Sequence, residues 1–305
     1  MIDTSTASLV CAGIGLSHRG RALLDGIELS AADGEIVGLV GPRGSGKTAL
    51  LRLIVGELPP SRGQVRIGGY AAGSIVARGL VGYAANPPLV PPELTGFEWL
   101  RYVASHCART AAERLDLIRS AIELGVLAEF VGRRVANYSR GMAQRLALAS
   151  AALCARKVVL LDESLGGTDP IVARQLRLNL SRLAAGGRLV ILASHDLSTV
   201  EQLATRAVVL SGGRIAADIS MAALLGERLV ELSLNGSALA DSGWLLHRFR
   251  GSTRTGDGVA IPLRSGLSVE QVLEECRAQR LAVVASRVRY RRLEDILVAA
   301  HDGRA

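Results

Sequence analysis

Hydrophobic residues of this chain follow two patterns that predict two kinds of strand. Short runs rich in Val, Ile and Leu, each followed by turn residues, lie at 35–41, 158–161 and 188–193. Continuous apolar runs of this length are typical of parallel strands buried on both faces. More exposed strands of an antiparallel layer are predicted at 8–16, 26–30 and 64–67.

Between residues 95 and 155 the pattern changes to that of helices. Thr95 followed by Glu98, and Thr110 followed by Glu113, are capping boxes that predict two helix starts. A helical insertion, about 87–155, is therefore expected to interrupt an α/β core.

After residue 226 the chain reads as strand, loop, strand, helix, strand, helix. Ser268 with Gln271 predicts the start of one helix, 281–287 is strand-like, and 292–300 predicts a final short helix. We expect residues 1–226 to form the main domain and 227–305 a small α+β domain.

Composition narrows the class of protein. A chain of 305 residues that is 49% hydrophobic can bury a large core, which excludes intrinsic disorder. The 36 basic and 28 acidic residues give a net charge of +8, but they are scattered, which favours a solvated surface. The longest apolar stretch, 146–155, is far shorter than the ~20 residues of a membrane span. We therefore expect neither a membrane span nor, from residues 1–10, a secretory signal.

Cysteines and lysines are few. The four cysteines stand far apart without a C-x-x-C pair, which argues against a disulfide framework, a redox motif or a zinc knuckle. A reducing, cytosolic compartment fits this usage best. Lys47 and Lys157 are the two lysines, so any lysine-dependent site has two candidates.

A glycine-rich motif, G-x-x-x-x-G-K-T, follows the first buried strand and precedes a helical pattern. Its residues are Gly41, Pro42, Arg43, Gly44, Ser45, Gly46, Lys47 and Thr48. Glycines let backbone N–H groups curl around phosphate oxygens, and the following helix N-terminus adds partial positive charge. We expect Lys47 to reach the β- and γ-phosphates of a nucleotide and Thr48 to bind Mg²⁺.

Two carboxylates end the second buried strand, Asp162 and Glu163. Open α/β sheets bind ligands at the carboxyl edge of their strands. Asp162 is expected to hold Mg²⁺ and Glu163 to act as the general base that polarises the attacking water.

These motifs alone do not decide which nucleotide is bound or what its hydrolysis drives. Guanine-specific proteins use an N-K-x-D motif, and Lys157 lacks the acidic residue at the required offset, which disfavours GTPase chemistry. A RecA-like or helicase-like motor acting on nucleic acid remains an alternative.

The region ahead of Asp162 favours one family. Tyr138, Ser139, Arg140, Gly141 and Met142 begin a helix about twenty residues before the Asp-Glu pair, and this segment resembles the L-S-G-G-Q signature of the ATP-binding cassette (ABC) transporter ATPases. In the same order follow Gly166, Gly167, Thr168 and Asp169, which resemble the D-loop, and His195, which resembles the switch histidine. The resemblance covers essentially residues 8–226.

The resemblance implies a fold and a mechanism. The fold is a P-loop NTPase cassette, with a RecA-like core, an antiparallel β subdomain and a helical subdomain. ATP with Mg²⁺ bound to the loop of one subunit is covered by Ser139 and Gly141 of a second, so each γ-phosphate joins two chains. Hydrolysis assisted by Glu163 and His195 then lets the subunits separate, and a separate transmembrane permease receives the motion.

Three positions depart from the family pattern. Asn86 stands at the Q-loop glutamine, which implies a weakened metal or water contact. His18 stands where an aromatic residue usually stacks on adenine, which implies altered nucleotide affinity. Ser164 replaces the proline after the catalytic glutamate and is expected to loosen that turn.

The C-terminal segment, which ends in residues 288–297, resembles the extension of drug- and polysaccharide-exporting ABC ATPases; the alternative is a generic α+β appendage that only buries sheet edges. The alternating arginines Arg287, Arg289, Arg291 and Arg292 could face acidic lipid headgroups, but this pattern is more typical of a solvated strand face. Our leading hypothesis is an exporter ATPase, a homodimer or heterodimer of cassettes on the cytoplasmic face of a membrane, with no nucleic acid as partner. Two alternatives are a soluble cassette ATPase acting on nucleic acid or ribosomes, and a degenerate cassette that binds ATP and regulates a partner.

Overall fold

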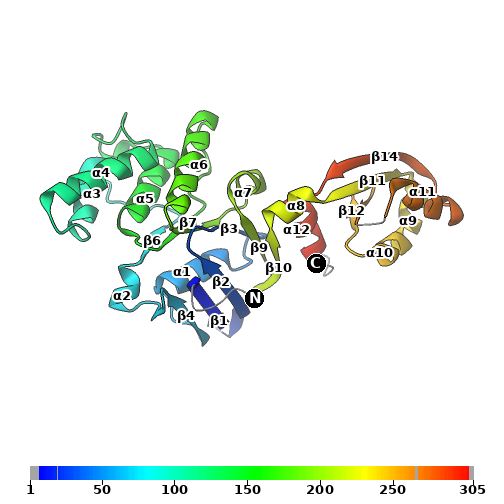
Figure 1. Ribbon diagram of the computed structural model, residues 1–305, viewed down its shortest axis with the longest axis horizontal. Coiled ribbons are helices and arrows are strands. Elements are labelled where there is room, and N and C mark those ends of the chain that lie inside the picture. The colour runs from blue at the N-terminus through cyan, green and yellow to red at the C-terminus, as the bar shows by residue number, and fades with distance from the viewer. Residues whose placement is uncertain (1–6, 19, 265–266, 302–305) are drawn as a thin grey trace. The chain divides into compact units, whose positions relative to one another are not determined.

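The chain divides into two compact units between Ile215 and Ala216, each with its own hydrophobic core. A computed structural model describes residues 7–18, 20–264 and 267–301 (Figure 1). The predicted boundary after residue 226 lies at the end of helix α8 (Met221–Gly226), inside the second unit.

A parallel sheet forms the centre of the first unit. In a six-stranded sheet of order β10-β9-β3-β8-β7-β6, the neighbours β9-β3, β3-β8, β8-β7 and β7-β6 run parallel. Its strands are β3 (Ile36–Val40), β6 (Val81–Ala84), β7 (Val158–Asp162), β8 (Leu189–Ala193), β9 (Arg206–Ser211) and β10 (Arg214–Ser220). Strand β10 crosses the boundary, and its residues from Ala216 onward belong to the second unit. Every residue of β3, β7 and β8 is buried, as their continuous apolar runs predicted.

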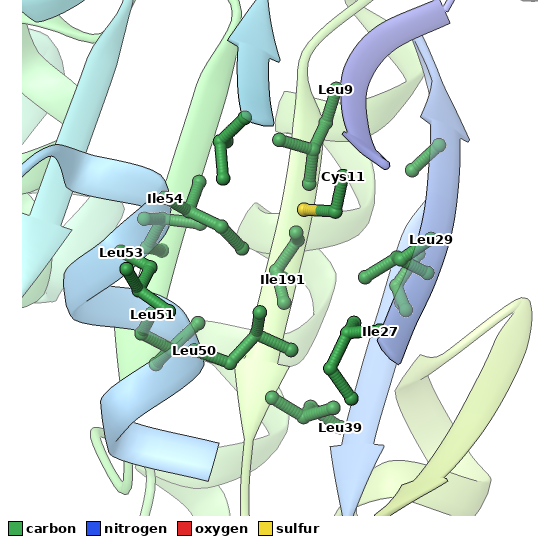
Figure 2. Packing of buried hydrophobic residues seen from close by; sticks show 14 of the residues in the cluster. Leu9, Cys11, Ile27, Leu29, Leu39, Leu50, Leu51, Leu53, Ile54 and Ile191 are labelled. Atoms are coloured by element: carbon green, nitrogen blue, oxygen red, sulfur yellow. The ribbon is translucent and has the colours of Figure 1, made fainter. Parts of the chain in front are cut away.

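An antiparallel sheet of order β2-β1-β4-β5 shares one hydrophobic core with helix α1 (Lys47–Val55) and the parallel sheet. Its strands are β1 (Ala7–His18), β2 (Arg21–Ala32), β4 (Arg62–Ile67) and β5 (Tyr70–Ala71). Figure 2 shows side chains of β1, β2, α1 and β8 meeting in one core, among them Leu9, Ile27, Leu50 and Ile191. This packing holds the start of α1, and so the glycine-rich loop, against both sheets.

The predicted helical insertion is present, with its own core. It contains α3 (Gly96–Ser105), α4 (Ala111–Gly125), a 3-10 turn (Val135–Asn137) and α5 (Arg140–Cys154) (Figure 1). Thr95 and Glu98 form the predicted capping box. Thr110 caps α4 as predicted, but Glu113 accepts from the backbone N–H of Arg109 at 2.7 Å instead of returning to the cap residue.

Two of the four cysteines are paired, against the expectation from their spacing. Cys107 and Cys154, 47 residues apart, form a disulfide with a Cα–Cα distance of 5.6 Å. They follow the end of α3 and close α5, two helices that pack side by side in the helical insertion. Cys11 and Cys276 are free and buried.

Further helices complete the first unit: α2 (Ile75–Arg78), α6 (Pro170–Ala185) and α7 (Leu197–Leu203). None of the helices in the described residues combines the length and the apolar character needed to cross a bilayer.

The second unit is an α+β fold around a four-stranded sheet of order β12-β13-β11-β14. Its elements beyond α8 are β11 (Arg228–Leu234), α9 (Gly236–Asp241), α10 (Gly243–Arg248), β12 (Thr253–Thr255), β13 (Gly258–Pro262), α11 (Val269–Ala278), β14 (Val283–Tyr290) and α12 (Leu293–His301). Ser268 and Gln271 form the predicted capping box. The stretch after β11 was predicted as a loop but contains α9 and α10. The side chain of Asn235 caps α9, and α10 packs on the core through its buried residues Leu245 and Leu246.

Candidate nucleotide site

The glycine-rich loop links β3 to α1, which is the position that its motif requires. Gly41, Gly44 and Gly46 have φ angles of +152°, +79° and +106°, which L side chains rarely adopt. A Cβ at Gly46 would lie 2.6 Å from Leu24 Cδ2, so the loop also lies too close to β2 for a larger residue. Such a loop turns its N–H groups toward one concavity, and the N-terminus of α1 adds partial positive charge there.

Lys47, the first residue of α1, is held inside this loop. Its Nζ donates hydrogen bonds to the carbonyl oxygens of Gly41 at 2.7 Å and Pro42 at 3.2 Å. Burial lowers the pKa of Lys47, while the charges of Glu163 and Asp162 act in the opposite direction. The ammonium group is therefore poorly solvated and poised to exchange backbone carbonyls for a stronger anionic partner.

Ser45 tests whether the loop fits a phosphate group. Its Oγ is buried and has no hydrogen-bond partner among the described residues. Buried hydroxyl groups nearly always have a partner, and an exception needs an explanation. Together with the three glycines, this orphaned hydroxyl fits a loop whose partners are phosphate oxygens supplied by a ligand.

Asp162 and Thr48 meet at the carboxyl end of β7. Thr48 Oγ1 donates to Asp162 Oδ2 at 2.9 Å, and the phenol of Tyr83 donates to the same oxygen at 3.4 Å. Burial, with the neighbouring charge of Glu163, raises the pKa of Asp162. Burial, with the charge of Asp162, raises the pKa of Tyr83 to about 12. Two hard oxygen ligands thus face one point, which suits a divalent cation.

Glu163 is aimed by its backbone and by a histidine. It has a φ of +52°, a left-handed conformation that is uncommon for residues other than glycine and is frequent at functional sites. Its Oε2 lies 2.6 Å from His195 Nδ1, and the backbone N–H of His195 lies 3.4 Å from the same oxygen. The strand ends of β7 and β8 therefore bring the predicted base and the predicted switch histidine into direct contact.

Backbone hydrogen bonds around Glu163 come from residues whose role the motifs did not reveal. Its N–H donates to the Ala193 carbonyl at 2.9 Å, and its carbonyl accepts from Gln144 Nε2 at 3.1 Å. Ser164, expected to loosen this turn, is buried, and its Oγ donates to the Asp162 carbonyl at 3.2 Å. This hydroxyl hydrogen bond links the two ends of the turn after β7, and the effect of Ser164 on the turn stays a prediction.

A cavity of about 420 Å³ gathers part of the predicted site. It is lined by Arg43, Asn86, Arg140, Gly141, Gln144, Glu163, Gly166, Gly167 and His195. Gly141 approaches the loop before α6 closely, since a Cβ on it would lie 3.0 Å from the Gly167 carbonyl oxygen. Residues far apart in sequence, from the phosphate loop, the Q-loop position, the signature and the D-loop, thus surround one volume.

Eleven predicted site residues do not line this cavity. Eight of them form the phosphate and metal part of the site described above: Gly41, Pro42, Gly44, Ser45, Gly46, Lys47, Thr48 and Asp162. The other three are His18, Ser139 and Asp169. His18 is the exposed last residue of β1, paired with Arg21. Ser139 caps α5, accepting from the Met142 N–H at 3.2 Å. Asp169 caps α6, accepting from the Ile171 N–H at 2.8 Å. Their assignment to nucleotide binding stays a prediction.

Similarity to known proteins identifies the family. The ABC transporter family profile matches residues 24–166. The Nod factor export ATP-binding protein I of Rhizobium leguminosarum bv. viciae is 30% identical over 227 residues, which are 74% of this chain and 73% of that protein. This chain belongs to the ABC transporter ATP-binding proteins. The family predicted from the signature and its neighbouring motifs is therefore confirmed, and it supports the predicted ATPase activity.

Other relatives of this ABC protein match over less of their length. The uncharacterized ABC transporter ATP-binding protein YdbJ of Bacillus subtilis (strain 168) is 37% identical over 204 residues, 66% of this chain and 65% of that protein. An uncharacterized counterpart in Nostoc sp. is 33% identical, over 67% of this chain and 62% of that protein. This chain thus matches slightly less than two thirds of the length of these relatives.

Solved structures confirm the predicted fold. The structure of an ATP-binding subunit of an ABC transporter shares a TM-score of 0.66 and 26% identity, covering 71% of this chain and 91% of that one. A dimeric ATP-binding cassette in a post-hydrolysis state, bound to ADP and Pi, has a TM-score of 0.64 at 20% identity, over 70% and 98% of the two chains. The P-loop cassette predicted from the motifs is the fold of this ABC protein.

Proposed function

We propose that this ABC protein hydrolyses ATP and powers export through a separate transmembrane permease. One observation carries the proposal most directly: Glu163 and His195 are in contact at the edge of a cavity that also reaches the phosphate loop through Arg43. The left-handed backbone of Glu163 supports this role, because such conformations are uncommon for residues other than glycine and cluster at functional sites.

Each part of the phosphate site has a role in this reaction. Lys47 leaves the carbonyls of Gly41 and Pro42 to bind phosphate oxygens. Thr48, Asp162 and the amide oxygen of Asn86 would hold Mg²⁺, which when bound neutralises phosphate charge.

Proton transfer falls to the pair beside the cavity. The Glu163 carboxylate accepts the proton of the attacking water, a role worth roughly 10² to 10⁴ in rate. The carboxylate of Glu163 can only accept, so Nδ1 of His195 carries the hydrogen of their contact, and Nε2 can donate to the γ-phosphate when the ring carries a hydrogen on both nitrogens.

A second cassette would complete the site. Ser139 Oγ accepts a hydrogen bond as the cap of α5, so its own hydrogen remains free to be donated to a phosphate of a facing chain. Gly141, which has no side chain, lets a phosphate approach the backbone beside Ser139. The N-terminus of α5 adds partial positive charge there. The partner cassette is a second copy of this chain or a related one.

The permease would dock on a groove of about 610 Å³ in the first unit. Three of its lining residues are apolar or aromatic and exposed: Ile75 at 90%, Val76 at 49% and Tyr102 at 56%. Arg78, His106 and Arg156 also line it, so a cytoplasmic permease segment with apolar and acidic residues fits. Strand β6 begins directly after Leu80 of this groove and ends two residues before Asn86, which lines the catalytic cavity. This strand therefore connects the proposed docking groove to the catalytic cavity over a short distance along the chain.

Export is favoured over import by two features. Relatives with 30% identity are named Nod factor export ATP-binding proteins, and the chain carries a C-terminal α+β unit like the extension expected for exporters. The protein would lie on the cytoplasmic face of the membrane, bound to its permease.

Substitution of Glu163 by Gln tests the ATPase part of the proposal. The amide keeps the size of the side chain and cannot accept the proton of water, so hydrolysis should fall at least 100-fold while ATP binding persists. Glu274→Gln, an exposed residue of α11, is the matched control and should leave turnover unchanged. With ATP, E163Q should elute as a dimer in size-exclusion chromatography. Wild-type turnover in E163Q, or a monomer at saturating ATP, would count against the proposal.

Ile75→Asp tests the docking part. The charge should deplete the protein from the membrane fraction of its native cells and leave ATP turnover of the purified chain unchanged. Leu115→Asp, a 51% exposed residue of α4 outside the groove, is the control. Equal membrane association of both variants would contradict docking at this groove.

A further inference from the structure

A second cavity lies wholly within the C-terminal unit and shares no residue with the nucleotide site. Its volume is about 420 Å³, which is within the range of ligand pockets. Strand β10, helices α8 and α12 and the segments that follow α8, α10, β13 and β14 contribute to it, and α8 and α12 are seen near each other in Figure 1. It is lined by Ala217, Ile219, Ala223, Leu224, Glu227, Arg250, Gly251, Arg264, Arg291, Ile296 and Ala299.

Much of the lining is apolar. Leu224 and Ile296 are buried at 2% and 5% exposure, and Ile219 is half-buried. Three alanines from β10, α8 and α12 add small apolar surface. A ligand with a short hydrocarbon body gains free energy by covering such a surface.

Charge in the cavity is strongly one-sided. Arg250, Arg264 and Arg291 line it together with a single acidic residue, Glu227. Arg291 Nη1 pairs with Glu227 at 2.5 Å, and the backbone N–H of Arg291 donates to the Glu227 carbonyl at 2.9 Å. This pair accounts for one positive and one negative charge, so the other two arginines leave a net charge of about +2.

Arg250 and Arg264 have no acidic partner within the described part of the chain, and both are exposed. Gly251 makes room for one of them: a Cβ at this glycine would lie 3.2 Å from Arg264 Nη2. The guanidinium of Arg264 therefore lies against the backbone next to Arg250. Elsewhere in this unit, Arg248 pairs with Glu275 and Arg289 with Asp295, so arginines here do find carboxylates where these are near.

We propose that this cavity binds an anionic amphiphile. Arg250 and Arg264 hold its phosphate or carboxylate head, and Ile219, Leu224 and Ile296 cover its short apolar body. Guanidinium groups bind both kinds of head through paired, charge-assisted hydrogen bonds. The proposal does not depend on the ATPase assignment, since none of these residues lies in the first unit. The ligand's source is either a soluble metabolite or the headgroup region of an anionic lipid.

Calorimetric titration of the full-length chain with hexyl phosphate tests the proposal. Saturating Mg·ADP in all samples keeps the probe from the phosphate loop. We expect one site per chain and weaker binding of inorganic phosphate, which lacks the apolar body. The double variant Arg250→Ala/Arg264→Ala should lose at least about tenfold in affinity, because charge-assisted hydrogen bonds are removed. Arg254→Ala, an exposed arginine of β12 outside the cavity, should bind like the wild type.

Circular dichroism melts of all variants establish that the chains are folded. Absence of hexyl phosphate binding by the folded wild type, or equal binding by the double variant, would overturn the proposal. Equal affinities for hexyl phosphate and inorganic phosphate would overturn the role of the apolar lining.

Cosedimentation with vesicles separates the two sources. If the ligand is a lipid, vesicles containing phosphatidylglycerol should pull down the wild type but not the double variant, and pure phosphatidylcholine vesicles should pull down neither. If the ligand is a soluble metabolite, the wild type and the double variant should cosediment equally while hexyl phosphate still discriminates between them.

Discussion

Gly41 offers the sharpest test of how the phosphate loop is built. Its φ is +152°, and a Cβ there would overlap the carbonyl oxygen of Leu210 and lie 2.8 Å from Ser45 Oγ. Gly41→Ala therefore combines an unfavourable backbone conformation with a steric clash against a strand. Gly44 separates the two effects: its φ is +79°, and a Cβ there meets nothing within 4 Å. Gly132, without a positive φ and with open space around it, serves as the control.

The expected losses differ among the three alanine variants. At Gly41 the backbone conformation costs about 1–3 kcal/mol and the overlap costs about 1–3 kcal/mol more. At Gly44 the conformation alone costs about 1–2 kcal/mol. For a unit of this size, about 1 kcal/mol lowers Tm by about 2–4 °C, so we expect a loss of about 12 °C for Gly41→Ala and about 4 °C for Gly44→Ala. Gly132→Ala should be neutral or slightly stabilising.

Thermal melts followed by circular dichroism, without nucleotide, measure this order directly. Mg·ATP should raise Tm of the wild type and of Gly132→Ala, and it should fail to do so for Gly41→Ala, whose shifted backbone displaces the Ser45 hydroxyl and the carbonyl that holds Lys47. The reasoning would be refuted if Gly41→Ala melted within about 2 °C of Gly132→Ala, a shift that corresponds to less than about 1 kcal/mol.

Three further substitutions probe the carboxylates and their surroundings. Burial raises the pKa of Asp162 in the folded chain above its value in the unfolded chain. As pH rises from the unfolded pKa through the folded pKa, ionisation of Asp162 therefore lowers the free energy of unfolding. Asp162→Asn should therefore raise Tm of the nucleotide-free protein at neutral pH, with a gain that fades on acidification, while ATPase activity is lost; a lower Tm at neutral pH would contradict this. Ser164→Ala removes a buried hydrogen bond worth about 0.5–1.5 kcal/mol and should lower the ATP turnover rate, measured by phosphate release, more than ATP affinity; an unchanged rate would show that the hydroxyl does not constrain Glu163. His195→Ala should lower the turnover rate at least tenfold with little change in ATP affinity measured by fluorescent-analogue binding, and a normal rate would exclude a role beside Glu163.

Sequence patterns predicted the sheets and the phosphate loop because each depends on local information. Continuous apolar runs lead to strands buried on both faces, as in β3, β7 and β8. Capping boxes at Thr95 and Ser268 located helix starts because the cap hydrogen bonds join residues three positions apart. The glycines of the loop are explained in the same way, by the backbone angles they must adopt.

Features that depend on contacts across the fold were missed. The disulfide between Cys107 and Cys154 depends on how α3 and α5 pack, which their spacing of 47 residues does not reveal. The contact of the buried Ser164 hydroxyl with the Ala84 carbonyl of β6, at 3.5 Å, likewise joins segments 80 residues apart. The backbone support of Glu163 by Gln144 also joins distant segments, and the glutamine's place two positions beyond Met142 gave no signal on its own.

Complementation between two inactive variants tests the central claim most directly, namely that two chains share each ATP site. Lys47→Ala disables the phosphate loop, and Ser139→Arg disables the signature, so each homodimer should be inactive. In a mixed dimer, one site combines the intact loop of the Ser139→Arg chain with the intact signature of the Lys47→Ala chain. Mixing should therefore restore ATPase activity to about a quarter of the wild-type level, since about half of the dimers are mixed and each has one intact site. A mixture of folded chains no more active than either variant alone would contradict the shared site.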